Sequence, residues 1–202
     1  MKNHPTISAP RAALVFKEMV DCRRGFRADN EFFKMPELLD FLFDDHGMWR
    51  INTYRSKETE DYKRKAGVIA FGDSVTITID EILLRKAKDG CKLSNFILAH
   101  ELGHVALDHH RRGLVTKHFQ LFRTQSGMSN VPPTSEELET NYAAVFLQCG
   151  IALFDERLTA LELAHRAFSD VGYVEKAQRL VRLPAFRREL SKLTKKYPRI
   201  VL

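Results

Sequence analysis

Positions 95–107 of the sequence read NFILAHELGHVAL, and this apolar stretch predicts the central helix of the fold. Its apolar residues recur at helical spacing and give the helix a buried side. Ser94 is a good N-cap candidate, so we expect the helix to cover about residues 95–109. His100 and His104 are four positions apart, and a helix therefore places their imidazoles on one face, one turn apart.

The His100-Glu101-x-x-His104 pattern is typical of zinc sites. Two histidine nitrogens at this spacing reach one zinc ion at about 2.0–2.1 Å. Glu101, next to the first histidine, reaches a water on the metal and can take its proton as a general base. Zinc lowers the pKa of such a water to about 7, which makes hydroxide available at neutral pH. A helix with two merely exposed histidines is the alternative, but burying these groups on an apolar helix without a partner is costly.

A catalytic zinc ion has three protein ligands and one open position, so the sequence must supply a third ligand. His110 is one candidate, because it occupies the last histidine position of H-E-x-x-H-x-x-G-x-x-H. That motif uses its glycine to turn the chain, and Leu107 stands at the glycine position here. The second candidate lies on a helix that Thr134 or Ser135 opens after a loop, where residues 136–144 read EELETNYAA.

Glu137 and Asn141 share one face of this second helix because they are four positions apart. Glu137 can then bind zinc while Asn141 accepts a hydrogen bond from the second ring nitrogen of a ligand histidine. Glu139 is turned by about 200° from Glu137 and points to the far side. Glu137 also ends a capping box that begins at Thr134, which would direct its carboxylate to the backbone. We favour Glu137 as the third ligand, while the capping role and Glu139 as the ligand stay open.

Hydrolysis of an amide also needs a hydrogen-bond donor that stabilises the tetrahedral intermediate beside the zinc ion. Four side chains of suitable chemistry are His109, His118, His165 and Tyr142. No spacing selects one of them, and each residue is more often found on the surface.

The clearest strand signal is the pair of β-branched runs at 68–71 and 75–79, which Gly72-Asp73 separates. These runs predict a β-hairpin, which needs a further strand and a helix to be stable. Residues 48–56 alternate weakly and are the candidate for that strand. Helical spacing predicts further helices over residues 10–21 and 36–46. The helix that begins at Thr134 or Ser135 is expected to run to about residue 154. The chain from residue 155 onward is also helical in pattern, with breaks near Gly172 and at Pro184. Strands in the middle of the chain with helices on either side predict an α+β fold.

Composition places the chain among globular proteins. Its 202 residues are the length of one domain. Because 44% of the residues are hydrophobic and 29% are charged, the chain can bury a core, and this composition excludes a disordered or collagen-like protein. No apolar run approaches the roughly 18 residues needed to cross a bilayer, and residues 1–20 lack the apolar stretch of a secretory signal. Three cysteines are too few, and odd in number, for a disulfide framework. We therefore expect a cytoplasmic protein with no membrane partner.

The net charge of +6 is unevenly distributed. Residues 174–202 contain nine basic and two acidic residues, whereas the rest of the chain contains 23 basic and 24 acidic residues. A basic C-terminus can bind nucleic acid or an acidic partner. A solvated amphipathic helix explains the same charges, and we favour that interpretation over DNA binding.

The hairpin, the motif FILAHELGH and the later motif ELETNYAA resemble the ImmA/IrrE family of zinc metallopeptidases over residues 67–153. Members of that family commonly read AHELGH followed by ExEANxFA. The second motif departs from this pattern, because Thr140 stands for the usual alanine and Ala143 for the usual phenylalanine. The resemblance implies a minimal zincin-like fold, in which a small antiparallel or mixed sheet lies beside the HExxH helix and one strand follows the active-site cleft. It assigns the zinc-ligand glutamate to Glu137.

The resemblance also implies a substrate. Many members are encoded with helix-turn-helix repressors, which they cleave or inactivate to switch on stress-response, mobile-element or phage-defence genes. We therefore predict one metallopeptidase domain over residues 1–202, with a helical N-terminal part (1–50), a catalytic core (67–154) and a basic helical C-terminal part (174–202). Its predicted activity is that of a zinc-dependent endopeptidase, which hydrolyses a peptide bond in a protein substrate.

The alternative from another functional class is a non-catalytic, zinc-containing regulatory protein. Such a protein would contact DNA or an acidic partner through the basic C-terminus. A structural zinc site usually has four protein ligands, and the sequence offers three. That difference favours catalysis.

Overall fold

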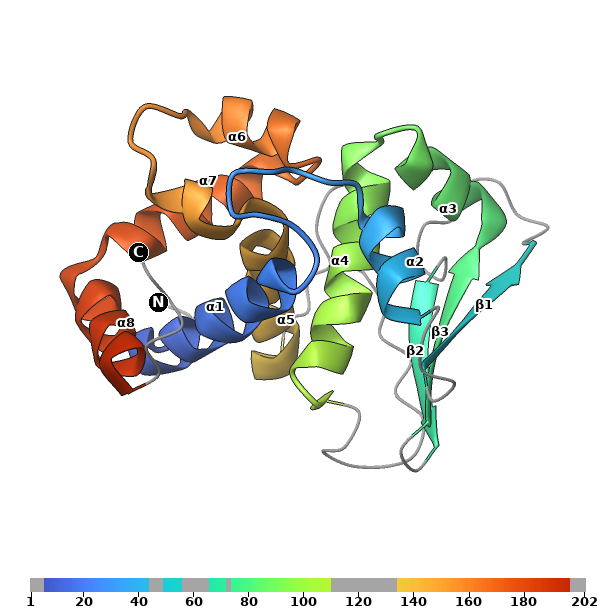
Figure 1. Cartoon of the computed structure of the whole chain (residues 1–202), viewed down its shortest axis with the longest axis horizontal. Helices are drawn as coiled ribbons and strands as arrows, with labels where there is room; N and C mark the ends of the chain where they lie inside the picture. The colour runs from blue at the N-terminus through green and yellow to red at the C-terminus, as the bar shows by residue number, and fades with distance from the viewer. Residues whose placement is uncertain (1–5, 44–48, 56–65, 72–73, 110–133, 197–202) are drawn as a thin grey trace.

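The computed structural model of the chain describes residues 6–43, 49–55, 66–71, 74–109 and 134–196 (Figure 1). Its helices and strands are, in chain order, α1 (Ala9–Arg24), α2 (Met35–Phe43), β1 (Trp49–Tyr54), β2 (Ala66–Phe71), β3 (Ser74–Asp80), α3 (Glu81–Lys88), α4 (Lys92–Ala106), α5 (Ser135–Cys149), the 3-10 helix η3 (Gly150–Phe154), α6 (Ala160–Arg166), α7 (Val171–Arg182) and α8 (Pro184–Lys196). Helices therefore stand before and after three strands, which confirms the predicted α+β fold.

The three strands form one mixed sheet in the order β1-β3-β2. The central strand β3 runs antiparallel to β2, with Val68 opposite Ile77, and parallel to β1. Its residues alternate between buried and partly exposed, as expected for a strand with one face on the core. The hairpin predicted from residues 68–71 and 75–79 is confirmed, while its predicted turn at 72–73 lies outside the described residues.

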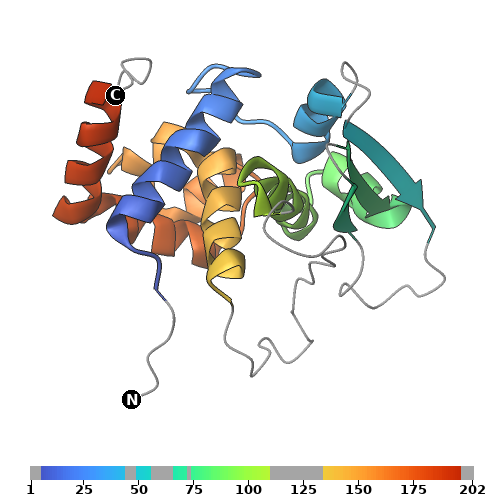
Figure 2. The ribbon, with the colours of Figure 1, turned by 90° about the horizontal axis from the view of Figure 1, so that it is seen from below.

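Helix α4 lies between two parts of the molecule (Figure 1). On one side it contacts α2, α3 and the sheet, and on the other it packs along α5, which in turn contacts α1. Figure 2 shows this order from below, with α5 between α1 and α4. Twelve of the 15 residues of α4 are buried. A helix that is surrounded in this way carries apolar residues on all sides, which explains the apolar stretch at 95–107.

A buried arginine on α1 bonds to the end of α5, and a glycine that follows α5 leaves room for this arginine. The guanidinium of Arg23, on α1, is fully buried and donates a hydrogen bond of 3.1 Å to the carbonyl oxygen of Leu147, near the end of α5. Gly150 follows with a φ of 54°, and a Cβ at this position would lie 2.8 Å from Nε of Arg23. A residue with a side chain would therefore clash here as well as be strained.

The remaining predicted elements before residue 155 are confirmed with shifted ends. The helices predicted over 10–21 and 36–46 are α1 and α2, and the weak strand at 48–56 is β1. The helix predicted to reach residue 154 ends at Cys149 instead. The positive φ of Gly150 stops the α-helix there, and the 3-10 helix η3 follows.

The predicted start of α4 is wrong. The helix begins at Lys92 with Cys91 as its N-cap, and Ser94 is buried within the first turn instead of capping it. The chain enters α4 early because Gly90, with a φ of 86°, turns it directly out of α3. Helix α3 is not among the predicted helices, although Asp80 caps it by accepting two backbone N–H groups.

The helical C-terminal region breaks close to both predicted points. Helix α6 ends at Arg166 and α7 begins at Val171, so Gly172 lies in the first turn of α7. Phe168, with a φ of 51°, turns the chain between these helices. The predicted break at Pro184 is confirmed, because Pro184 opens α8, where a residue without an N–H group is tolerated.

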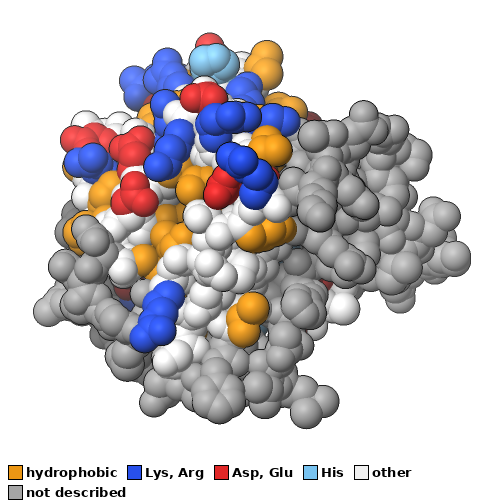
Figure 3. All heavy atoms as spheres, turned by 90° about the vertical axis from the view of Figure 1, so that its right-hand side faces the viewer, with side chains coloured by type: hydrophobic (Ala, Val, Ile, Leu, Met, Phe, Trp, Pro, Cys, Tyr) orange, Lys and Arg blue, Asp and Glu red, His pale blue; other side chains and the backbone are white. Residues whose placement is uncertain are grey.

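The described surface carries charges of both signs. On the face in Figure 3, which turns the right-hand side of Figure 1 toward the viewer, Lys and Arg side chains lie next to Asp and Glu side chains. Hydrophobic side chains lie between and below them. None of the described helices combines the length and the hydropathy needed to span a membrane.

Candidate metal centre

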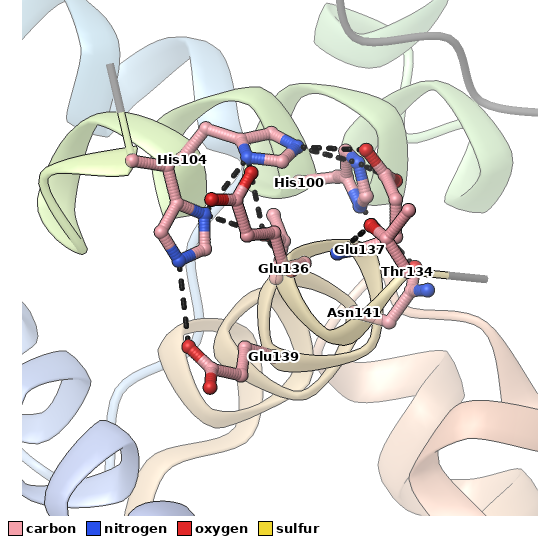
Figure 4. A network of polar contacts seen from close by, with 9 residues as sticks. His100, His104, Thr134, Glu136, Glu137, Glu139 and Asn141 are labelled. Carbon is pink, nitrogen blue, oxygen red and sulfur yellow. Dashed lines mark hydrogen bonds and ion pairs between the residues drawn. The ribbon is translucent and has the colours of Figure 1, made fainter. Parts of the chain in front are cut away.

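Helices α4 and α5 approach closely at Gly103. A Cβ at this position would lie 3.1 Å from Cγ2 of Thr140 and 3.2 Å from Cβ of Ala143, so the glycine permits the short distance between the helices. Gly103 directly precedes His104, and His100 lies one turn earlier on α4. Both imidazoles are directed at the first turns of α5 (Figure 4). The packing of the two helices therefore places the histidine-bearing face of α4 against the start of α5.

His100, His104 and Glu137 bring three ligand atoms together, all within 4.8 Å of one another. Nε2 of His100 lies 3.1 Å from Nε2 of His104 and 3.2 Å from one carboxylate oxygen of Glu137. The other oxygen of Glu137 lies 3.6 Å from Nε2 of His104. A tetrahedral zinc ion with bonds of about 2.0–2.2 Å separates two of its ligand atoms by about 3.3–3.6 Å. The three side chains therefore fit a metal ion of this kind.

His100 is supported by one residue of α5. Its Nδ1 lies 3.2 Å from Oδ1 of Asn141, one turn beyond Glu137 (Figure 4). A metal on Nε2 leaves the ring proton on Nδ1, which then donates a hydrogen bond to the Asn141 oxygen. The four-residue spacing of Glu137 and Asn141 thus lets one helix face contact both ring nitrogens of His100.

His104 has two neighbours at its second ring nitrogen. Its Nδ1 lies 3.0 Å from Nδ1 of His109 and 3.2 Å from Oγ1 of Thr140. The Thr140 hydroxyl donates its own proton to the carbonyl oxygen of Glu136, at 2.8 Å. Its oxygen therefore faces the imidazole as an acceptor.

Sequence reasoning misses both neighbours of His104. Thr140 was detectable, because it lies one turn from Glu137 and hence near the same face of α5. The position of His109 was not, because it depends on Asp108, which adopts a φ of 54° just after the end of α4. Left-handed conformations are uncommon outside glycine, and no glycine marks this turn in the sequence.

Glu101 is a buried carboxylate next to the metal-ligand candidates. It is 1% exposed, and its Oε2 has no hydrogen-bond partner in the described part of the chain. Burial, together with the negative charge of Glu137, raises the pKa of Glu101 well above its usual value. An unpartnered buried carboxylate oxygen is costly. This oxygen therefore keeps its capacity to accept a hydrogen bond or a proton beside the ligand candidates.

The first turn of α5 separates the roles of Glu137 and Glu139. Oγ1 of Thr134 accepts a hydrogen bond of 3.2 Å from the N–H of Glu137, so Thr134 caps the helix. The carboxylate of Glu137 nevertheless points at the histidines and not back at Thr134 (Figure 4). Glu139 projects from another side of α5, where it forms an ion pair of 2.7 Å with Arg11 and lies 3.4 Å from Nε2 of His109.

The other candidate residues lie elsewhere. His110, the alternative third ligand, and His118 are outside the described residues. His165 is exposed near the end of α6, and the ring of Tyr142 packs 5.8 Å from that of Phe146. His109 is fully buried and contacts the edge of His104 opposite to the ligand nitrogen. Its position is therefore that of a support for His104.

Comparison with known proteins gives one match. The sequence model of peptidase family M48 matches residues 59–169, a range that includes all of α4 and α5. No curated protein and no solved structure matches the chain. The matching family is one of metallopeptidases, in agreement with the enzyme class predicted from the HExxH stretch, and the narrower ImmA/IrrE assignment stays a prediction.

Proposed function

The chain belongs to peptidase family M48, and from this membership and the geometry between α4 and α5 we propose that it is a zinc-dependent endopeptidase. His100, His104 and Glu137 would hold the zinc ion, because one ligand atom from each lies within 4.8 Å of the other two, close to the spacing of ligands around tetrahedral zinc. Zinc bound there lowers the pKa of a coordinated water and polarises the carbonyl group of a substrate.

Glu101 would move the proton in this reaction. Its buried and unpartnered Oε2 would accept a proton from the attacking water and pass it to the nitrogen of the departing amine as the peptide bond breaks. Asn141 would keep the ring of His100 in the orientation that directs Nε2 at the metal. The chain would thereby supply three ligands, one base and one orienting amide from two adjacent helices.

The observation that carries the proposal is the triangle of ligand atoms with an unpartnered carboxylate beside it. A structural zinc site is closed by four protein ligands, whereas a catalytic site has three and one open position. In the described part of the chain the group contains three ligand side chains, and Glu101 adds an acceptor without a partner. This combination favours hydrolysis over a structural zinc site.

The sheet supports a peptide as the substrate. Among the described strands, β1 and β2 lie at the two edges of the sheet, and β2 contacts α4, the helix with both histidines. An extended peptide can add to the edge of a sheet through backbone hydrogen bonds. We therefore propose that β2 is the strand that follows the active-site cleft, as the ImmA/IrrE resemblance implies.

The proposed substrate is a protein, and more specifically a helix-turn-helix transcriptional repressor. The resemblance of residues 67–153 to the ImmA/IrrE family supports this choice. We also propose a cytoplasmic location, which the three free cysteines of the chain support.

The proposal is tested by incubating the purified protein, loaded with one equivalent of zinc, with an unfolded protein such as casein and with any helix-turn-helix protein that a neighbouring gene encodes. We expect internal peptide bonds to be cut, as detected by mass spectrometry. A chelator should stop the reaction, and added zinc should restore it. A chain that binds zinc but cuts neither protein would favour the alternative, a non-catalytic zinc-containing regulatory protein.

That alternative would use the basic surface of α7 and α8. Both helices direct apolar residues into the core, among them Val181 and Phe186, and expose basic residues such as Arg182 and Arg188. This arrangement is the one expected for solvated amphipathic helices. It therefore explains the basic C-terminal region without DNA or an acidic partner.

A further inference from the structure

The rings of His100 and His104 are held in place by different numbers of residues. His100 contacts Asn141, and the described support on that side is this single amide. His104 contacts His109, which continues to Glu139 on α5 and from there to Arg11 on α1. The support of His104 thus extends from α4 to a helix that contributes no residue to the ligand triangle.

The backbone brings His109 into this position by a turn after α4. The helix ends at Ala106, and Asp108 adopts a left-handed conformation with a φ of 54°. Asp is one of the few residues other than glycine that tolerate this region. The turn returns the chain toward α4, so His109 is fully buried with Nδ1 3.0 Å from Nδ1 of His104.

The proton positions in this series follow from the chemistry of the groups. A short contact between two ring nitrogens requires a proton on one of them and none on the other. Zinc on Nε2 of His104 leaves its proton on Nδ1, which then faces two acceptors, Nδ1 of His109 and Oγ1 of Thr140. The proton of His109 is then on Nε2, which faces Oε2 of Glu139 at 3.4 Å. The same oxygen accepts a hydrogen bond of 2.7 Å from Nη2 of Arg11. Every donor in the series therefore meets an acceptor.

We infer that His109, Glu139 and Arg11 form a positioning chain that fixes the ring of His104 and thereby raises the affinity of the centre for zinc. The inference rests on the proposed function, because it requires a metal on Nε2 of His104. Residues that orient a metal-binding histidine typically change metal affinity by about 10-fold to 100-fold when they are replaced.

Helix α1 is suited to anchor this chain. Arg11 projects from the part of α1 whose neighbouring residues are packed in the core, namely Ala12, Ala13, Val15 and Phe16. Because the buried face of α1 fixes the backbone from which Arg11 projects, the ion pair of Arg11 holds the Glu139 carboxylate in one place. The orientation of His104 would therefore depend on a residue 93 positions earlier in the sequence.

Arg24 offers a matched control on the same helix. It forms an ion pair of 2.6 Å with Asp29, and its side chain is 22% exposed, compared with 25% for Arg11. The contacts that form the positioning chain join His104, His109, Glu139 and Arg11, and Arg24 is not one of these residues. Replacing either arginine by methionine removes one partly buried ion pair and keeps the aliphatic part of the side chain.

The experiment measures the zinc dissociation constant by competition with a chelator for the wild type, Arg11→Met, Arg24→Met, His109→Phe and the Arg11→Met/His109→Phe double variant. Thermal unfolding of each metal-free protein reports stability separately. The absorption spectrum of the Co²⁺-loaded proteins reports ligand geometry, which a general loss of stability does not change.

We expect His109→Phe to weaken zinc binding by about 10-fold to 100-fold and Arg11→Met by about 3-fold to 10-fold. Arg24→Met should bind zinc like the wild type although it loses similar stability. The double variant should bind zinc as His109→Phe does, because Arg11 acts through His109. Equal zinc affinities for Arg11→Met and Arg24→Met would overturn the inference. A wild-type protein that binds no zinc would instead overturn the proposed function itself.

Discussion

Helices α4 and α5 both contribute to the candidate metal centre, but their residues are buried to different extents. The histidines lie in the second half of α4, which is buried on all sides, and their side chains are 1% and 0% exposed. Glu137 lies in the first turn of α5, and its side chain is 22% exposed. A ligand within a packed helix is held by its neighbours, whereas a ligand at a helix end depends on the cap. The centre thus combines a rigid half with a half that is more easily displaced.

The rigid half should give the largest effect. His104→Ala removes one of the two nitrogens on α4, and we expect the zinc content to fall from about one ion per chain to near zero, with loss of any peptidase activity. Metal analysis after gel filtration measures this change. Circular dichroism of the variant checks that the helices remain. Undiminished zinc in a folded His104→Ala protein would refute the assignment of the whole centre.

The second effect tests the half on α5. Glu137→Gln should lose zinc under mild chelation, because the amide is a poor ligand for zinc. Glu139→Gln is the matched control, since Glu139 is on the same helix but points at Arg11 and not at the histidines. We expect Glu139→Gln to keep its zinc in the same chelator. The opposite result would exchange the roles of the two glutamates, and retention of zinc by both variants would make His110 the leading third ligand.

The third prediction tests whether α4 supplies the general base as well as two metal ligands. Glu101→Gln should keep one zinc ion per chain, because Glu101 is not in the ligand triangle. Its peptidase activity should fall by about 10²-fold to 10⁴-fold, since the amide cannot accept a proton from water. Zinc content and cleavage rate are measured on one preparation. Wild-type activity in Glu101→Gln would show that another group is the base.

The difference between the two helices also explains what could be predicted from the sequence. The positions of His100 and His104 on one face follow from a spacing within one helix, which holds in any fold. The same is true of Glu137 and Asn141. Spacing alone does not show that these two faces meet, because that depends on packing between segments 41 positions apart. The need of a catalytic zinc ion for a third ligand suggested the connection, and the family resemblance supported it.

The features that escaped prediction depend on backbone turns and on tertiary contacts. The left-handed conformation of Asp108 turns the chain so that His109 lies against His104, and the sequence has no glycine there that would predict this turn. Gly90 turns the chain into α4 before the predicted cap at Ser94. Arg11 was invisible as a contributor because its partner Glu139 is 128 positions away. Local sequence patterns carry no information on such contacts.

The smallest expected effect concerns the cap that holds Glu137 in place. Thr134 and Thr159 cap α5 and α6, each accepting a hydrogen bond of 3.2 Å from the N–H three residues later, and Thr159 also forms a reciprocal capping box with Glu162. Replacing either threonine by alanine should lower the free energy of unfolding by about 1 kcal/mol, as measured by urea denaturation of the metal-free protein.

The two cap variants should differ in zinc binding. Without its cap, the first turn of α5 is ordered for a smaller fraction of the time, and the apparent zinc affinity falls by that fraction. A loss of about 1 kcal/mol changes the equilibrium between ordered and disordered turn about fivefold, so the zinc affinity of Thr134→Ala falls by at most about fivefold. Thr159→Ala should bind zinc like the wild type, because α6 contributes no residue to the ligand triangle. If Thr134→Ala also kept its full affinity, the first turn of α5 would be held by packing alone, and the contrast between the two helices would disappear.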